Sequence, residues 1–162
     1  MIQIHRILVP VDFSDCSRAA LEHAIHFGNS LGVEAVDVMH VWRPPRFVGL
    51  DTKVRVQGGK EQTLREFAQS EVGAEMKRFL AELEHGGRFK VGGRLEAGEP
   101  HRRILSIAEA EHYDLIIMGT HGVARSGRLG SLASRIVRDA PCPVLTIRVP
   151  GSGHTDPPPE AT

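Results

Sequence analysis

The sequence lacks several features that would assign it to a specialised class of protein. It has only two cysteines, Cys16 and Cys142, and they do not form a Cys-x-x-Cys pair, so neither a disulfide framework nor a zinc site is indicated. No apolar run approaches the roughly 18 residues that a membrane-spanning helix needs, and the N-terminal residues lack the pattern of a secretory signal. We therefore expect a cytoplasmic protein with reduced thiols and no membrane partner.

An excess of either charge is also missing, because 20 Lys and Arg balance 20 Asp and Glu. Bulk charge therefore indicates no nucleic-acid partner. There is no Gly-x-Ser-x-Gly elbow, no His-Glu-x-x-His and no spaced carboxylate pair, so no catalytic residues are predicted. His23 and His26 share a predicted helix face, but no third ligand accompanies them, and no metal site is predicted.

Short apolar segments alternate with amphipathic ones along most of the chain. The predicted strands are 4–11, 35–41, 89–95, 115–118 and 144–149. The predicted helices are 14–32, 64–83, 100–111 and 132–137. Strict alternation favours an α/β domain with a parallel sheet and helices on both faces. We predict a single doubly wound open sheet of five parallel strands over residues 1–149, followed by a disordered polar tail over 150–162.

The order of the strands decides where a ligand would bind. Right-handed crossovers leave two common orders, and we favour 3-2-1-4-5, in which a crevice opens between the first and fourth strands. Ligands of such sheets lie beyond the carboxyl ends of the strands. Those ends are Pro10-Val11-Asp12 and the segment 118–122. The connector over 43–59 has no predicted secondary structure, and its length is typical of functional or mobile loops.

A glycine-rich segment, Gly119 to Ser131, follows the most apolar strand and leads into a helix. Glycine lets backbone N–H groups approach a phosphate, and a helix start adds unpaired N–H groups. Arg125 and Arg128 add positive charge, while Ser131 either caps the helix or bonds a phosphate oxygen. His121 is either a donor to the ligand or a turn residue. A mobile loop is the alternative, but the position at the crevice favours an anion site.

Two familiar glycine motifs do not fit this chain. The turn after the first strand, 12–15, contains no glycine, which argues against a nicotinamide enzyme. Gly122 and Gly127 have the spacing of a P-loop, but Arg128-Leu129 follows where Lys-Ser/Thr is required.

Seven short motifs in order resemble the universal stress protein family over Ile4 to Arg148. They are Ile7-Leu-Val-Pro-Val-Asp12-x-Ser14, Ala19-Ala-Leu-x-x-Ala24, His40-Val41, Gly98-x-Pro100, Asp114 to Gly122, Gly130-Ser131 and Ala140 to Leu145. The resemblance implies a 3-2-1-4-5 sheet and dimerisation through the last strand. It also implies a division between members that bind ATP and members that do not, the binders carrying Gly-x2-Gly-x9-Gly-Ser/Thr.

By that similarity, Gly119, Gly122, Gly130 and Ser131 hold phosphates and ribose. Asp12 and Val41 face the base, and Pro10, Met118 and Val144 line the pocket. The complete predicted site is Pro10, Val11, Asp12, Val41, Met118, Gly119, His121, Gly122, Arg125, Arg128, Gly130, Ser131 and Val144. For Asp12, placing Mg²⁺ and capping the first helix are the other roles that remain open, and Cys16 is predicted to serve packing.

The chain departs from the binders' motif at one place, because only seven residues separate Gly122 from Gly130. Two residues extended span about 7 Å, comparable to the width of a phosphate group. The shorter loop therefore either closes on a diphosphate, holds ATP with altered geometry, or has lost the site. The retained glycines and Ser131 favour binding of ATP or ADP, with Mg²⁺ carried by the nucleotide.

The leading functional prediction is an ATP-binding regulatory protein of the stress response. It acts as a nucleotide-dependent dimer through the last strand, Val144 to Arg148, an apolar edge open to pairing, together with an unidentified protein partner. The alternatives are a nucleotide-independent interaction module and, more weakly, a slow ATPase.

Overall fold

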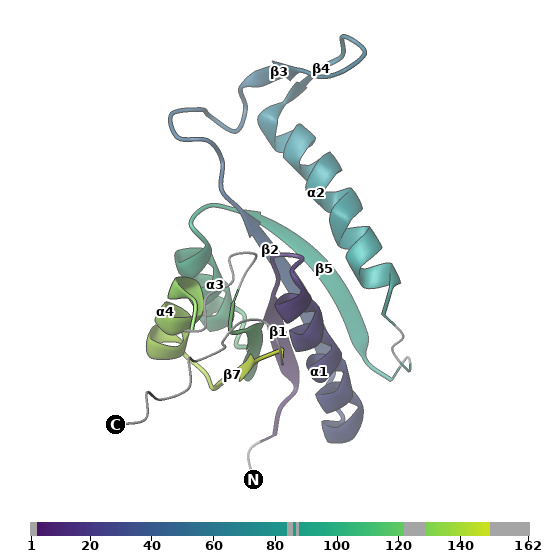
Figure 1. The fold of residues 1–162 in the computed structure, drawn as a ribbon, viewed down its shortest axis with the longest axis vertical. Helices are drawn as coiled ribbons and strands as arrows, with labels where there is room; N and C mark the ends of the chain where they lie inside the picture. Colours follow the sequence, from purple (N-terminus) through teal and green to yellow (C-terminus); the bar gives the residue numbers. More distant parts are fainter. Residues whose placement is uncertain (1–2, 84–85, 87, 122–128, 150–162) are drawn as a thin grey trace, which may run out of the picture.

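A five-stranded parallel sheet forms the centre of the protein (Figure 1). The computed structural model describes residues 3–83, 86, 88–121 and 129–149. The order across the sheet is β5-β2-β1-β6-β7, which is the predicted 3-2-1-4-5 order when only these strands are counted along the chain, so that prediction is confirmed. The strands are β1 (Arg6–Pro10), β2 (Ala35–Trp42), β5 (Lys90–Ala97), β6 (Leu115–Gly119) and β7 (Val144–Ile147).

Helices cover both faces of this sheet, as the strand pattern predicts. They are α1 (Asp15–Leu31), α2 (Leu64–Ala81), α3 (Pro100–Ala110) and α4 (Ser131–Asp139). Alternate residues of one strand serve opposite faces, since Ile7 and Val9 pack with α1 and α2 whereas Leu8 packs with α3 and α4. Over the described residues, none of the helices combines the length and the apolar character needed to cross a membrane.

The signals at the helix ends explain why the helices begin and stop where they do. Ser14 caps α1 by accepting a hydrogen bond from the Ser17 amide, and Gly32 ends that helix in the left-handed region at φ 68°. Pro100 occupies the first turn of α3, where its missing N–H costs nothing. These three sequence predictions are confirmed.

The connector after β2 contains a hairpin that the sequence analysis missed. Strand β3 (Lys53–Arg55) pairs antiparallel with β4 (Glu61–Thr63), and the turn between them has Gly58 and Gly59 at positive φ. Thr63 and Glu66 then form a capping box that starts α2. Figure 1 shows the hairpin at the N-terminal end of α2, well beyond the sheet. Strands so short carry little apolar alternation, and the Gly-Gly pair was their only clear sequence signal.

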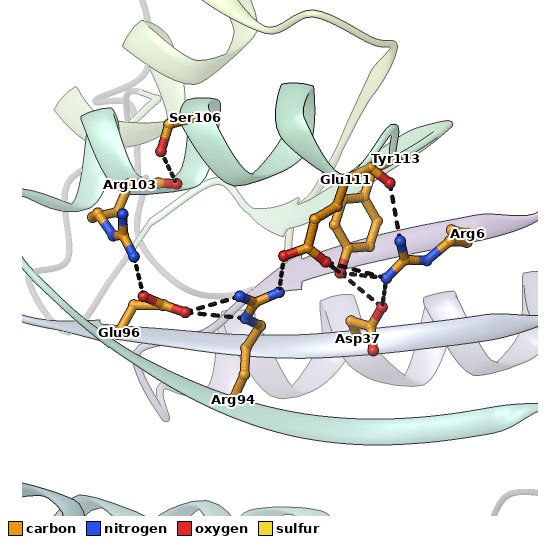
Figure 2. A network of polar contacts seen from close by, with 8 residues as sticks. All are labelled: Arg6, Asp37, Arg94, Glu96, Arg103, Ser106, Glu111 and Tyr113. Atoms are coloured by element: carbon orange, nitrogen blue, oxygen red, sulfur yellow. Dashed lines mark hydrogen bonds and ion pairs between the residues drawn. The ribbon is translucent and has the colours of Figure 1, made fainter.

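A chain of ion pairs links β5 and β2 to the end of α3 (Figure 2). Arg94 Nη1 lies 2.7 Å from Glu111 Oε1, and Arg6 Nη2 lies 2.8 Å from Asp37 Oδ2. The Tyr113 hydroxyl donates to the same Asp37 oxygen at 2.7 Å. Burial is the larger cause that raises the pKa of Tyr113, and this hydrogen bond is the next. Polar contacts therefore join β1, β2 and β5 to the end of α3 and to Tyr113, which follows it.

The ion pairs predict how stability depends on acidity. The hydrogen bond from Arg94 lowers the pKa of Glu111 below its ordinary value. A carboxyl group with a lowered folded pKa stabilises the fold above the ordinary glutamate pKa of about 4.3, and this contribution is lost as the pH falls further. We expect the urea midpoint of the protein to drop between pH 5 and pH 3, and Glu111→Gln to make that drop shallower.

The matched control is Glu22→Gln, which removes a carboxylate that is exposed on α1. It should leave the acid dependence of the urea midpoint as in the unsubstituted protein. An equal change in both variants would contradict a specific role for the Arg94–Glu111 pair.

Candidate functional site

A cavity of about 470 Å³ opens at the carboxyl ends of β1, β2 and β6. Its origin lies in the sheet, because β1 pairs with β6 only at Ile7 and Leu8, whereas it pairs with β2 up to Pro10. The space beyond the short β1–β6 pairing is closed on its other side by the starts of α3 and α4. This is the crevice that the strand order predicts.

Most of the predicted site residues meet at this cavity. The predicted residues that line it are Pro10, Val11, Asp12, Val41, Met118, Gly119, His121, Gly130 and Ser131. Gly122, Arg125 and Arg128 lie outside the described residues. The sequence analysis missed further lining residues, which are Met39, His40, Pro100, Ile104, Thr120, Leu132 and Ala133. Several of these directly adjoin predicted residues along the chain, and that adjacency was the available signal.

Val144 is the predicted residue that the structure does not bring to the cavity. It pairs with Ile116 near the start of β7, whereas Ile147 pairs with Gly119 at the carboxyl end. Because the strands are parallel, the register places Val144 about three residues back from the mouth. Its side chain packs instead into the core beneath α3 and α4.

Gly119 has a structural reason that does not involve any ligand. A Cβ at this position would lie 2.8 Å from the Cβ of Cys16 and 2.9 Å from its carbonyl carbon. The first turn of α1 therefore approaches the end of β6 more closely than any side chain would allow. Cys16 is buried there, which agrees with its predicted packing role.

The amide of Gly130 is already engaged. It donates to the Thr120 carbonyl oxygen at 2.8 Å, and the Thr120 amide donates to Ile147 O at 2.9 Å. A Cβ at Gly130 would lie 3.1 Å from Thr120 O. Gly130 thus brings the start of α4 close to the end of β6, and other groups must supply the donors for an anion.

Those donors are found in the first turn of α4. Gly130 is the N-cap of this helix and provides no side-chain cap, so the alternative that Ser131 caps the helix is wrong; Ser131 is its first residue. The amides of Ser131, Leu132 and Ala133 have no partner within the helix, and all three residues line the cavity. The positive end of the helix dipole adds to these donors.

Two polar side chains stand at other parts of the cavity wall. Asp12 Oδ1 accepts from the Ser14 amide at 3.1 Å and from its hydroxyl, so Asp12 supports the cap of α1 while it lines the cavity. His121 is only 6% exposed, and its Nδ1 lies 2.8 Å from Thr120 Oγ1. Its Nε2 has no hydrogen-bond partner among the described residues. Much of the remaining wall, including Val41, Met118 and Ile104, is apolar and suits a flat ring.

The close approach at Gly119 predicts a loss of stability. Gly119→Ala should lower the free energy of unfolding by about 1–3 kcal/mol, the usual cost of overpacking, because backbone atoms of Cys16 cannot retreat easily. Urea denaturation without any ligand measures it. In the control Gly73→Ala, the new Cβ meets only Leu95 Cδ1 at 3.7 Å, and alanine in a helix should be neutral or stabilising. A neutral Gly119→Ala would contradict the packing role.

Known proteins resemble this chain over nearly its whole length. The universal stress protein family model matches residues 3–148. Universal stress protein MJ0531 from Methanocaldococcus jannaschii is 33% identical over 147 residues, covering 90% of this chain and 82% of that protein. Universal stress protein MJ0577 from the same organism is 32% identical over 158 residues, covering 91% of this chain and 96% of that protein.

Solved structures share the fold. That of MJ0577 has a TM-score of 0.69 at 29% identity, covering 93% of this chain and 99% of that chain. A universal stress protein in complex with cAMP has a TM-score of 0.66 at 18% identity, covering 89% and 97%. A universal stress protein family protein from Arabidopsis thaliana with AMP bound has a TM-score of 0.62 at 18% identity, covering 94% and 97%. From the family match and the MJ0531 relative, we conclude that the chain belongs to the universal stress protein family.

Proposed function

We propose that the cavity binds an adenine nucleotide, ATP or ADP, and that the protein is an ATP-binding regulatory protein of the stress response. The observation that carries the proposal is the start of α4, where three residues whose backbone amides lack helical partners line a cavity that otherwise has a largely apolar wall. An anionic group and a flat apolar ring are what such a combination suits. The family members with bound AMP and cAMP support the choice of adenine.

Each part of the nucleotide is assigned to particular residues of the cavity wall in this proposal. The first turn of α4 and the Ser131 hydroxyl hold a phosphate, while Val41 and Met118 contact the base. Asp12 lies near the base and the ribose. The predicted phosphate ligands Arg125 and Arg128 belong to the shortened loop, outside the described residues. Mg²⁺ enters with the phosphates, since the described residues contain no cluster of three or more metal-ligating side chains.

The regulatory part of the proposal needs a surface that reports nucleotide binding. We propose a homodimer through β7, which lies at the edge of the sheet and so offers unpaired backbone groups to a second chain. The nucleotide would bias this dimer toward or away from an unidentified protein partner, in the cytoplasm. A nucleotide-independent interaction module is the alternative, and a slow ATPase is the weaker one.

The proposed phosphate position predicts the effect of one substitution. Ser131→Pro removes a backbone donor and a hydroxyl, yet proline suits the first position of a helix, and Gly130 at φ −57° and ψ 154° already has the conformation that proline requires before it. Hydrogen bonds to charged groups contribute about 1.5–3 kcal/mol. We therefore expect the dissociation constant for Mg-ATP to rise about tenfold or more by calorimetry, with an unchanged thermal midpoint of the free protein.

Ser134→Ala is the control, because it removes a hydroxyl from the same helix at a position outside the cavity lining. It should bind Mg-ATP as the unsubstituted protein does. If millimolar Mg-ATP neither binds nor raises the thermal midpoint of the unsubstituted protein, the nucleotide-independent alternative replaces the proposal.

The dimer has its own test on β7. The carbonyls of Pro143 and Ile147 accept from β6, so the alternating Thr146 directs its amide toward the free edge. Thr146→Pro should therefore leave the β6–β7 ladder intact but convert a dimer into a monomer, as measured by light scattering. The control Thr146→Val retains the amide and should remain dimeric. A monomeric unsubstituted protein would exclude dimerisation through this edge.

A further inference from the structure

The turn between β1 and α1 contains a backbone conformation that its sequence disfavours. Phe13 has a φ of 62°, in the left-handed region that bulky side chains rarely adopt. The residue lies directly after Asp12, which lines the cavity, but Phe13 is not itself among the lining residues. Conformations of this kind persist only where neighbouring contacts hold them, and they often occur at functional sites.

Aromatic contacts hold Phe13 in place. Its ring stacks on His40 with centroids 4.6 Å apart and an angle of 22° between the planes. It also meets the edge of Phe79 on α2 at 5.5 Å. The partly buried ring packs against the core beneath α1 and α2. Moving Phe13 into an ordinary backbone conformation would break these contacts, so the packing maintains the turn.

His40 also fixes the residue on the other side of Asp12. Its Nδ1 lies 2.8 Å from the Val11 carbonyl oxygen, and because a carbonyl only accepts, the proton must be on Nδ1. The Val11 amide donates to Met39 O at 2.8 Å. Both backbone polar groups of Val11 are therefore tied to β2.

Asp12 is thus held between two fixed neighbours. Its own Oδ1 is bound by Ser14, whose hydroxyl caps α1. We propose that Phe13 and His40 are positioning residues, which hold the left-handed turn so that the Asp12 carboxylate faces the nucleotide. The inference rests on the proposed function for its ligand, although the turn itself is a property of the free protein.

Two substitutions at Phe13 distinguish the effect of the left-handed backbone conformation from the effect of the aromatic ring. Phe13→Ala removes the stacking and leaves a residue that disfavours positive φ, whereas Phe13→Gly removes the stacking but adopts positive φ readily. Because preorganisation of a site contributes to affinity, we expect Phe13→Ala to weaken Mg-ATP binding about tenfold in calorimetry. Phe13→Gly should recover most of the affinity.

Phe27→Ala is the matched control, since it truncates another partly buried phenylalanine that packs on the same core but does not line the cavity. It should reduce thermal stability without weakening Mg-ATP binding. The inference is overturned if Phe13→Ala binds no more weakly than Phe27→Ala. It is equally overturned if the glycine and alanine variants at position 13 lose the same affinity.

A readout without ligand keeps this inference separable from the proposed function. The Ser14 amide donates to Asp12 Oδ1, so its hydrogen exchange should be faster in Phe13→Ala than in Phe27→Ala. Nitrogen chemical shifts should also show His40 protonated on Nδ1. If the unsubstituted protein binds neither Mg-ATP nor AMP, the proposed function fails, and Ser14 exchange alone then decides whether Phe13 and His40 hold the turn.

Discussion

The short pairing of β1 with β6 is the constraint on which the site depends. These two central strands share only the register Ile7–Leu115 and Leu8–Ile116. Beyond that point β1 stays paired with β2 up to Pro10, and β6 stays paired with β7 up to Gly119, so a cavity opens where β1 and β6 are no longer joined. Because the strands are parallel, both contribute their carboxyl ends, and the loops that follow them carry the polar groups of the site.

Around this cavity, the glycines and the helix amides have different tasks. Gly119 admits the first turn of α1, and Gly130 bonds the Thr120 carbonyl and brings α4 close. The Gly130 amide is therefore engaged within the fold, whereas the amides in the first turn of α4 have no partner within the helix. These two glycines therefore serve close packing, and Gly130 places the start of α4 beside the end of β6.

Sequence reasoning reached the order of the strands and most of the cavity lining, because strand ends in a parallel sheet converge whatever their distance along the chain. Val144 is a predicted site residue that does not line the cavity, and the register between β6 and β7 that sets its place cannot be read from either strand alone. Sequence reasoning missed the β3–β4 hairpin because three-residue strands beyond the sheet bury few side chains. The contact between Phe13 and His40 joins two elements and carries no local signal.

The sequence by itself determined the layers of this protein, since alternating apolar strands and amphipathic helices can bury their faces only as a covered parallel sheet. It also determined the position of the crevice and the ends of several helices, where single residues such as Ser14, Gly32 and Pro100 act locally. Only the tertiary structure decided which residues of α3 and α4 line the cavity and how Asp12 is held. Those outcomes depend on hydrogen bonds and close approaches between segments that meet only after the sheet has formed.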